Sequence, residues 1–420
     1  MKYPRIVHAK QQFESNCLSD IAGNIKSEID KVFPYTKIKK CDKVALTVGS
    51  RGISNLKDIV FTIVNTLKEK GCDVIIIPSM GSHGGATREG QINVLRHYGI
   101  TEESMGVHID GNMEVEMIGH TEEGLNVYVA KSALQADHIV VFNRVKAHTD
   151  FKGSIESGLC KMITIGLGKR EGASYYHRAA VNNGGYKVIE SVGKAVLKQA
   201  NIAFGLAVVE DGNDDTTLVK GILPKDIVHE DKELLKLAKK MMPKLPFQEL
   251  DILIIDEIGK DISGTGMDTN VVGRFMNIYV SEPELPAITR IYARGLTRNT
   301  DGNATGMGLA DFISKKLYDE IDYTSTYINC LTGLVVEKAR VPYVCSNDID
   351  AMNCLMQTIG VVEPEDVKMI WIKNTLELSD MYISEALAQK ANESKSLIVT
   401  GEFEDLKFDN DGWFVSPFEK

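Results

Sequence analysis

The residues that could do chemistry in this chain begin with two histidines, each of which follows a short apolar run. His83 lies in PSMGSHGGAT and His148 lies in NRVKAHTDF, while Arg51 follows a third apolar run in VGSRGI. Imidazole titrates near neutral pH, so a histidine can serve as a general acid or a general base. A lone histidine is more often a plain surface residue. Three such residues after three successive strands favour one shared site.

A lysine and a third histidine follow in the same half of the chain. Lys161 lies in SIESGLCKMITIGLG, which is an unusually small and apolar environment for a lysine. Burial would lower the pKa of its amine and make the neutral amine available as a nucleophile, although a lysine more often extends its charge to solvent. His177, in GASYYHRAA, could bind nickel, zinc or copper, but one histidine does not make a metal site.

Two further segments could bind anionic groups. Gly84 and Gly85 would let backbone amides approach a ligand closely, and the helix that follows Thr87 would present its N-terminus to a phosphate or carboxylate. In the second half of the chain, Glu257 and Lys260 follow another apolar run, and Lys260 could anchor a carboxylate. The fingerprints of nicotinamide dehydrogenases, P-loop proteins, zinc peptidases and EF-hands do not occur.

The elements that must position these residues alternate between strand and helix. Apolar runs at 43–50, 72–79, 138–143 and 202–210 alternate with amphipathic patterns such as 58–71. This rhythm predicts an α/β fold with mostly parallel, Rossmann-like sheets covered by helices on both faces. Because the carboxyl ends of parallel strands share one edge, the three loops that follow the first strands should open on the same edge.

The chain is long enough for two domains of this kind. A helical stretch ends at two prolines before a new apolar run, which places the expected domains at 1–245 and 246–420. A net charge of −10 argues against a nucleic-acid or anionic-membrane partner. The first residues lack the apolar segment of a signal peptide, and the seven scattered cysteines form no C-x-x-C pair. We therefore expect a cytoplasmic protein.

Taken together, these residues resemble a known family. Their types and their order along the chain resemble those of the nickel-dependent lactate racemase superfamily. The residues that carry the resemblance are Arg51, His83, His148, Lys161, His177 and Lys260. The segments SMGSHGGAT and NRVKAHTDF…ESGLCKM resemble the branch of lactate-racemase-like proteins without an assigned substrate. The resemblance implies two α/β domains with the active site in the cleft between them. It also implies a nickel pincer nucleotide, a pyridinium mononucleotide whose two sulfur-bearing arms bind nickel together with a ring carbon.

The resemblance assigns a role to each residue of the first half. Lys161 would hold the cofactor covalently through a thioamide, and His177 would be the protein ligand of nickel. His83 and His148 would be the acid/base pair. The glycine-rich turn that ends at Thr87 would contact the cofactor.

The contacts of the substrate differ from those of lactate racemases. Arg51 and Lys260 would bind the substrate or nearby anionic groups, with Glu257 beside them. Val48 stands where lactate racemases carry an acidic residue, Glu257 stands in place of a glutamine, and His83 is followed by glycine rather than by arginine and proline. These departures favour a substrate that is larger than lactate or differently substituted.

We therefore predict a racemase or epimerase of a small-molecule 2-hydroxy acid. Hydride would leave the carbon while a histidine takes the hydroxyl proton, and it would return on the other face of the keto acid. Two alternatives stay open: a nicotinamide-type 2-hydroxy acid oxidoreductase, and a non-catalytic protein that binds the nickel nucleotide. The enzymes that make the cofactor are the other expected partners, and the sequence does not give the oligomeric state.

Overall fold

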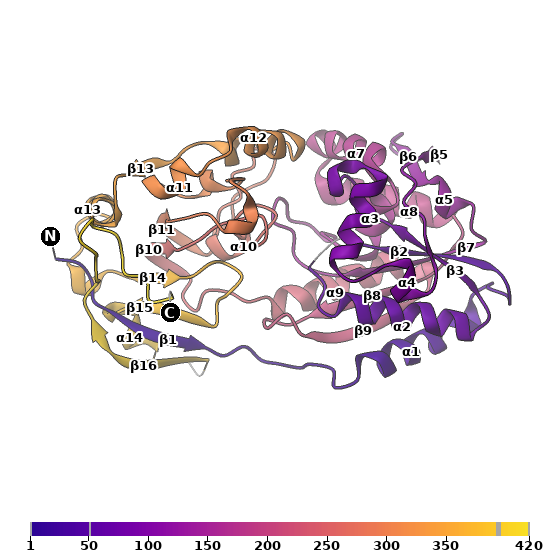
Figure 1. The fold of residues 1–420 in the computed structure, drawn as a ribbon, viewed down its shortest axis with the longest axis horizontal. Helices are drawn as coiled ribbons and strands as arrows, with labels where there is room; N and C mark the ends of the chain where they lie inside the picture. Colours follow the sequence, from indigo (N-terminus) through magenta and orange to yellow (C-terminus); the bar gives the residue numbers. More distant parts are fainter. Residues whose placement is uncertain (1, 50–51, 392–395, 419–420) are drawn as a thin grey trace. The chain divides into compact units, whose positions relative to one another are not determined.

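The computed structural model describes residues 2–49, 52–391 and 396–418 (Figure 1). It divides into an N-terminal unit, Glu14–Met242, and a C-terminal unit that combines Met1–Phe13 with Pro243–Lys420. The two units meet in sequence at 242/243, close to the expected 245/246. The first thirteen residues differ from the expectation, because β1 (Ile6–Gln11) pairs with strands of the C-terminal unit.

A six-stranded sheet forms the centre of the N-terminal unit, in the order β4-β3-β2-β7-β8-β9. Its strands run parallel except for the edge strand β9, which is antiparallel to β8. The predicted α/β class and the shared edge of the strands that precede the candidate loops are confirmed. The strands are β2 (Lys43–Val48), β3 (Asp73–Pro78), β4 (His108–Ile109), β7 (His138–Arg144), β8 (Ile202–Glu210) and β9 (Thr216–Ile222).

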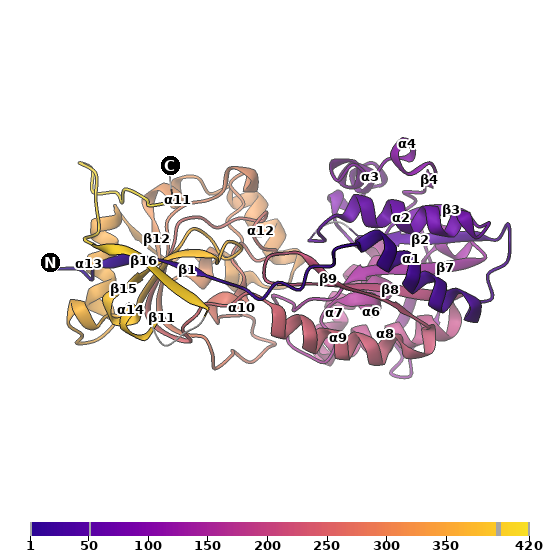
Figure 2. The ribbon, with the colours of Figure 1, turned by 90° about the horizontal axis from the view of Figure 1, so that it is seen from below.

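Helices cover both faces of this sheet, because successive strand residues alternate between two apolar cores. In β2, Leu46 packs with α1 and α2, whereas Ala45 packs with the cluster beneath α6 to α9. Figure 2 shows these two helical layers on opposite sides of the sheet. The helices are α1 (Ile21–Val32), α2 (Leu56–Glu69), α3 (Arg88–His97), α4 (Glu102–Met105), α5 (Lys131–Leu134), α6 (Gly158–Lys161), α7 (Lys169–Asn183), α8 (Gly185–Gln199) and α9 (Ile227–Met241).

A hairpin of β5 (Val115–His120) and β6 (Asn126–Ala130) packs beside α7 and α8. Three tyrosines join the hairpin to α7: the Tyr176 hydroxyl accepts the backbone N–H of Tyr128 at 2.8 Å, and the Tyr175 hydroxyl accepts that of Asn126 at 3.3 Å. Burial raises the pKa of Tyr176 far above its ordinary value. The hairpin therefore fixes the buried face of the helix on which His177 lies.

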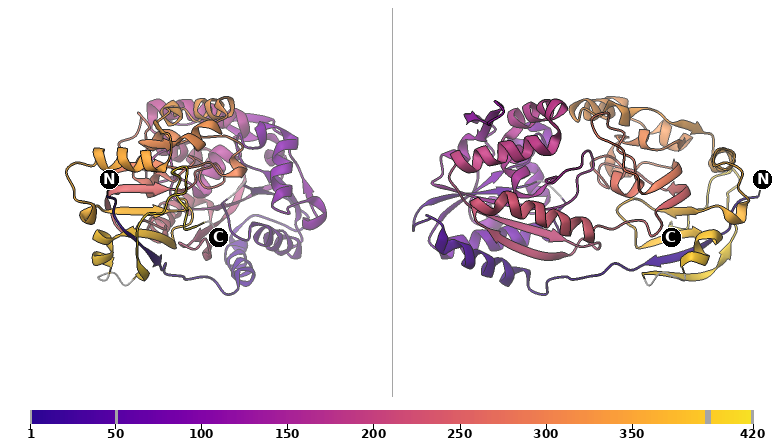
Figure 3. Two further views of the ribbon diagram at one scale, coloured as in Figure 1. Left: turned by 60° about the vertical axis from the view of Figure 1, so that its left-hand side comes forward. Right: turned by 180° about the vertical axis from the view of Figure 1, so that it is seen from behind.

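The C-terminal unit contains an eight-stranded mixed sheet, in the order β13-β12-β11-β10-β14-β15-β1-β16. Its first five strands are parallel and the last three are antiparallel. Figure 3 shows the N-terminal strand, in indigo, beside the yellow C-terminal strands. The strands are β10 (Glu249–Ile255), β11 (Ala287–Ala293), β12 (Phe312–Ser314), β13 (Tyr343–Cys345), β14 (Met369–Ile372), β15 (Asp380–Ser384) and β16 (Leu397–Glu404).

Among the described residues, five α-helices accompany this sheet, again around two cores. Ile252 and Ile254 of β10 face one core with α13, and Leu253 and Ile255 face the other with α14. The helices are α10 (Thr269–Val272), α11 (Lys315–Asp319), α12 (Tyr323–Thr332), α13 (Asp348–Thr358) and α14 (Glu385–Ala391). In residues 2–49, 52–391 and 396–418, no helix is long and apolar enough to cross a membrane.

Candidate active site

His83 lies in the loop that joins β3 to α3, at the carboxyl end of the central sheet. The residue is exposed. Its backbone N–H donates to the Met80 carbonyl at 3.1 Å, and its own carbonyl accepts the Ala86 N–H at 3.3 Å and the Gln91 amide at 3.4 Å. The backbone of the loop is thus fixed from both sides, and the residue remains accessible to a ligand.

In the glycine-rich turn after His83, Gly84 and Thr87 are in close contact with the start of α3, whereas Gly85 is open. The Thr87 hydroxyl accepts the Gly90 N–H at 3.0 Å, so the predicted N-cap of α3 is confirmed. A side chain at Gly84 would collide with the backbone of Gly90, only 2.5 Å away, whereas a Cβ at Gly85 would meet no atom within 4 Å. The backbone of Gly85 is therefore the more open of the two to an approaching ligand. The expected contacts of Gly84, Gly85 and Thr87 with a cofactor stay a prediction.

His148 lies in the loop after β7 and is held there by two contacts of its ring. Its Nδ1 accepts the backbone N–H of Asp150 at 3.0 Å. The ring stacks on Phe151, with centroids 4.2 Å apart and planes 27° from parallel. Because Nδ1 accepts a hydrogen bond, a neutral His148 carries its proton on Nε2.

Lys161 shares the same aromatic neighbour. Its Nζ lies 5.9 Å from the centre of the Phe151 ring. Burial lowers the pKa of the Lys161 amine to about 8, with a further lowering by Lys146, while Asp150 opposes the change. The side chain is half-buried rather than fully enclosed. Lys161 therefore combines a partly neutral amine with access from outside.

His177 lies on α7 and belongs to the same electrostatic neighbourhood. The surrounding protein lowers the pKa of its imidazole, although the residue as a whole is exposed. The Lys161 ammonium lowers that pKa further and the Asp150 carboxylate raises it. A neutral imidazole is the form that binds a transition metal. The structure thus groups Lys161 and His177 with the loop of His148.

The chain between Lys161 and His177 has an irregular helical path. A π-helical turn, Met162–Gly166, follows α6 directly, and Lys169 begins α7 with a φ of 53°. π-Helical turns interrupt α-helices frequently at functional sites. Lys169 is fully buried, and its Nζ donates to the Pro78 carbonyl at 2.6 Å, which ties the start of α7 to the end of β3. Burial lowers its pKa to about 8 as well, but its enclosure leaves Lys161 as the lysine that a ligand can reach.

Arg51 lies outside the described residues, although its loop is anchored just beyond it. Glu210, at the end of β8, accepts the Ser54 N–H at 2.6 Å and forms an ion pair with Arg144. Arg144 also donates to the Gly52 carbonyl at 2.9 Å. Burial raises the pKa of Glu210 to about 7, and Arg144 opposes that change. The Arg144–Glu210 pair therefore orders the segment that follows Arg51.

Glu257 and Lys260, the predicted substrate contacts, lie after β10 in the C-terminal unit. The Lys260 Nζ donates to the Gly264 carbonyl at 2.5 Å. Glu257 accepts the Asn374 amide at 2.9 Å and lies 3.9 Å from the Lys373 Nζ. Both side chains are engaged within their own unit, and their contact with a substrate stays a prediction.

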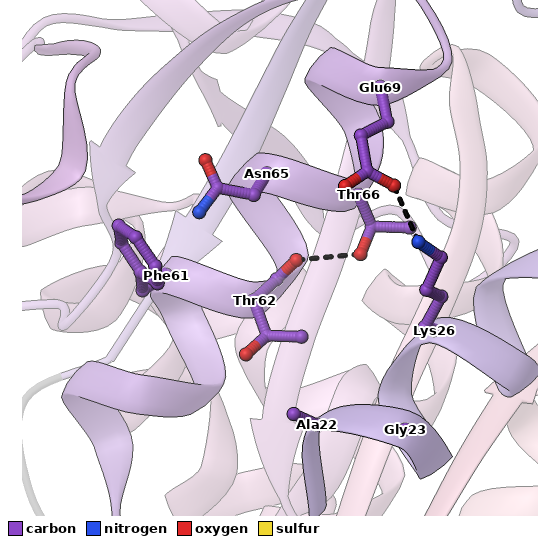
Figure 4. A pocket seen from close by; sticks show the side chains of 8 residues that line it. All are labelled: Ala22, Gly23, Lys26, Phe61, Thr62, Asn65, Thr66 and Glu69. Atoms are coloured by element: carbon purple, nitrogen blue, oxygen red, sulfur yellow. Dashed lines mark hydrogen bonds and ion pairs between the residues drawn. The ribbon is translucent and has the colours of Figure 1, made fainter.

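A separate hollow of about 260 Å³ lies between α1 and α2 (Figure 4). An ion pair of 2.7 Å between Lys26 and Glu69 crosses it, and Phe61 is exposed at its rim. Its α2 residues belong to the later turns of that helix, which runs back toward the amino ends of the strands. This hollow therefore does not belong to the edge that carries the candidate residues.

Two buried carboxylates beside the site were not singled out from the sequence. Glu156 and Asp231 are almost completely buried, at 0% and 1% exposed. Asp231 did carry a signal, because it interrupts the apolar stripe of α9 that Ile227, Leu234 and Ala238 form. A carboxylate in such a position must be hydrogen-bonded inside the fold.

Residues 37–187 match the family model of the lactate racemase N-terminal domain. This segment of the chain is therefore similar to the N-terminal domain of lactate racemases. The matched segment contains the three grouped candidates, His148, Lys161 and His177, and it also contains His83.

A solved structure supports the fold of this chain. It is the lactate racemase apoprotein from Thermoanaerobacterium thermosaccharolyticum, with a TM-score of 0.50 and 12% sequence identity. The match covers 88% of this chain and 98% of that one. At this identity the likeness shows the fold alone. No curated protein sequence matches the chain.

Proposed function

We propose that this lactate-racemase-like chain is a racemase or epimerase of a 2-hydroxy acid that works with a nickel pincer nucleotide. The observation that carries the proposal is the grouping of His148, Lys161 and His177. Phe151 contacts both His148 and Lys161, and Asp150 acts on both Lys161 and His177. This grouping lies within the segment that matches the lactate racemase domain.

The residues present fit such a cofactor. Lys161 offers a half-buried amine whose lowered pKa leaves part of it neutral, which is the form that attacks or is acylated. His177 offers an imidazole whose lowered pKa favours the neutral form that binds a metal. Within the described part of the chain, no group of three or more histidine, cysteine, aspartate or glutamate side chains could hold a metal ion. Nickel held by His177 would therefore need further donors from a bound organic group, which is what a pincer nucleotide provides.

When bound, the cofactor would supply a hydride acceptor, and the histidines of the chain would move the hydroxyl proton. Neutral His148 presents Nε2–H and is set to donate to a substrate oxygen. To act as a base at Nε2, the ring must give up its bond with the Asp150 amide, which costs about 0.5–1.5 kcal/mol. A general base typically contributes about 10²–10⁴-fold in rate, so this cost is affordable. His83, whose ring is exposed, would serve the other face of the substrate.

The substrate class follows from the same chemistry. A 2-hydroxy acid brings a carboxylate, for which Lys260 and Arg51 are the proposed partners, with Glu257 beside them. Glu257 repels a carboxylate unless its charge is compensated, and Asn374 and Lys373 partly do so. This is the physical reason to propose a substrate other than lactate itself.

The test is to co-express the chain with the enzymes that build the nickel nucleotide, then to measure intact mass and map any adduct. We expect an adduct on Lys161 that is absent from Lys161→Ala and retained in the surface variant Lys198→Ala. In a chiral screen of 2-hydroxy acids, His83→Ala should lower racemisation by about 10²–10⁴-fold while the adduct remains.

Other outcomes would contradict the proposal in distinct ways. An unmodified Lys161 without bound nickel would exclude the pincer cofactor, and turnover that depends on added NAD would then indicate an oxidoreductase. An adduct with no racemisation, and no effect of His83→Ala or His148→Ala, would indicate a protein that only binds the nucleotide.

A further inference from the structure

The segment between His148 and Lys161 is braced from inside by Glu156. This fully buried carboxylate accepts the backbone N–H of His148 itself at 2.9 Å through Oε2. Its Oε1 accepts the backbone N–H of Gly153 at 2.8 Å and pairs with Lys239 of α9 at 2.6 Å. Both carboxylate oxygens are therefore used, and they fix the start and the middle of the loop that carries His148.

A second buried carboxylate braces the helical turn that carries Lys161. Asp231 accepts the backbone N–H of Leu159 at 3.1 Å and that of Cys160 at 2.7 Å, immediately before Lys161. Gly158 makes this approach possible, because its φ is +79° and a Cβ there would lie 2.5 Å from the Asp231 carboxylate.

Helix α9 contributes to both braces, because it carries Asp231 and also Lys239, the ion-pair partner of Glu156. Asp231 and Lys239 are separated by about two turns of α9, so they lie on the same side of it. Asp231 reaches α6, and Lys239 neutralises Glu156 beneath the loop of His148. A shift of α9 would thus move two groups of the site together, whereas loss of one carboxylate would release only one of them.

We propose that Glu156 is a positioning residue for His148 and that Asp231 is a positioning residue for Lys161. The proposal rests on the proposed function for the roles of His148 and Lys161. The contacts themselves do not depend on it. Neither carboxylate touches the reacting atoms. Each acts by fixing backbone amides, which sets where the functional side chain begins.

The experiment compares Glu156→Gln with Asp231→Asn. Each substitution keeps the volume of the side chain but replaces one acceptor oxygen by an NH₂ group, which cannot accept the backbone N–H that it faces. Glu233→Gln is the matched control, because Glu233 lies on α9 with an exposed side chain paired to Lys236. The first readout is hydrogen exchange of the cofactor-free chain, measured on peptide fragments. We expect Glu156→Gln to lose protection at 146–153 and Asp231→Asn to lose it at 158–162. Glu233→Gln should change neither.

The second readout uses the chain co-expressed with the cofactor-building enzymes. Asp231→Asn should lower the occupancy of the adduct on Lys161 by about 10-fold or more. Glu156→Gln should keep that occupancy and lower kcat by about 10–100-fold with little change in KM, the cost of a misplaced catalytic group.

The outcomes separate this inference from the proposed function. If both variants lose exchange protection, adduct occupancy and kcat to the same extent, the chain is generally destabilised and the inference is overturned. Unchanged exchange at 146–153 and 158–162 would also overturn it. A wild-type chain without adduct or racemisation would overturn the proposed function, and the exchange data would still decide the bracing. If either variant does not fold, Lys239→Gln replaces Glu156→Gln and Gly158→Ala replaces Asp231→Asn. Each should give the same losses as the variant it replaces, but smaller ones.

Discussion

The amine of Lys161 should react with acylating reagents at a pH where ordinary lysines are almost inert. Its pKa is lowered from 10.5 to about 8, first by burial. At pH 7.5 an amine of that pKa is neutral in about a quarter of the molecules, against about 0.1% for an ordinary lysine. A less basic amine is also a weaker nucleophile. With a Brønsted slope near that of thiols, about 0.4–0.5, the net advantage in acylation rate is about 20-fold.

The assay is acylation of the cofactor-free chain between pH 6 and 11, followed by peptide mapping, with N-acetyl-lysine in the same tube as the reference. The rate at Lys161 should rise to a plateau with a midpoint near pH 8. Asp150→Asn removes the carboxylate that raises the pKa and should move the midpoint down. Lys146→Met removes a cation that lowers it and should move the midpoint up.

The two variants are matched, because each removes one charge from the same loop and the expected shifts are opposite in sign. A midpoint above about pH 10 would refute the argument that burial makes this amine available. Shifts of the same sign in both variants would refute the assignment of the local charges, since a general loosening of the loop would expose Lys161 in either case.

Three further results are expected. Gly158→Ala should lower the free energy of unfolding by about 1–3 kcal/mol in denaturant titrations, because the position has a left-handed φ and faces Asp231; full stability would contradict the bracing. Asp348→Ala should lower it by about 3–5 kcal/mol, since Asp348 is one of two carboxylates paired with the buried Arg294 and also accepts the Phe414 N–H, yet acylation of Lys161 should not change. Selective ¹⁵N labelling should show neutral His148 protonated on Nε2, and a signal from the other tautomer would exclude its bond through Nδ1.

Much of the site's framework could be predicted from the sequence because it depends on local pattern. The apolar runs before His83 and His148 form parallel strands of one sheet, so their following loops open on one edge. The N-cap at Thr87 follows from residue type and spacing alone. The apolar surroundings of Lys161 in the sequence offered a buried amine as one of two interpretations, and burial in the structure lowers its pKa.

The path of the first strand could not be predicted in the same way. β1 lies between β15 and β16, which come from the other end of the chain. Pairing of strands uses backbone hydrogen bonds that every residue type except proline can make, so the side chains of β1 do not specify which strands it pairs with. The partners of β1 are set by where β15 and β16 come to lie in the folded C-terminal unit.

The sequence by itself determined the class of the fold, the strand ends that carry the candidate residues and the resemblance to lactate racemases. Only the tertiary structure decided that Lys161 rather than Lys169 is open to a ligand, and that Glu156 and Asp231 hold the neighbouring backbone. Burial and hydrogen bonding between distant segments set these properties, as when Asp231 meets Cys160. Such contacts exist only after α9 has packed against α6, and no local pattern encodes them.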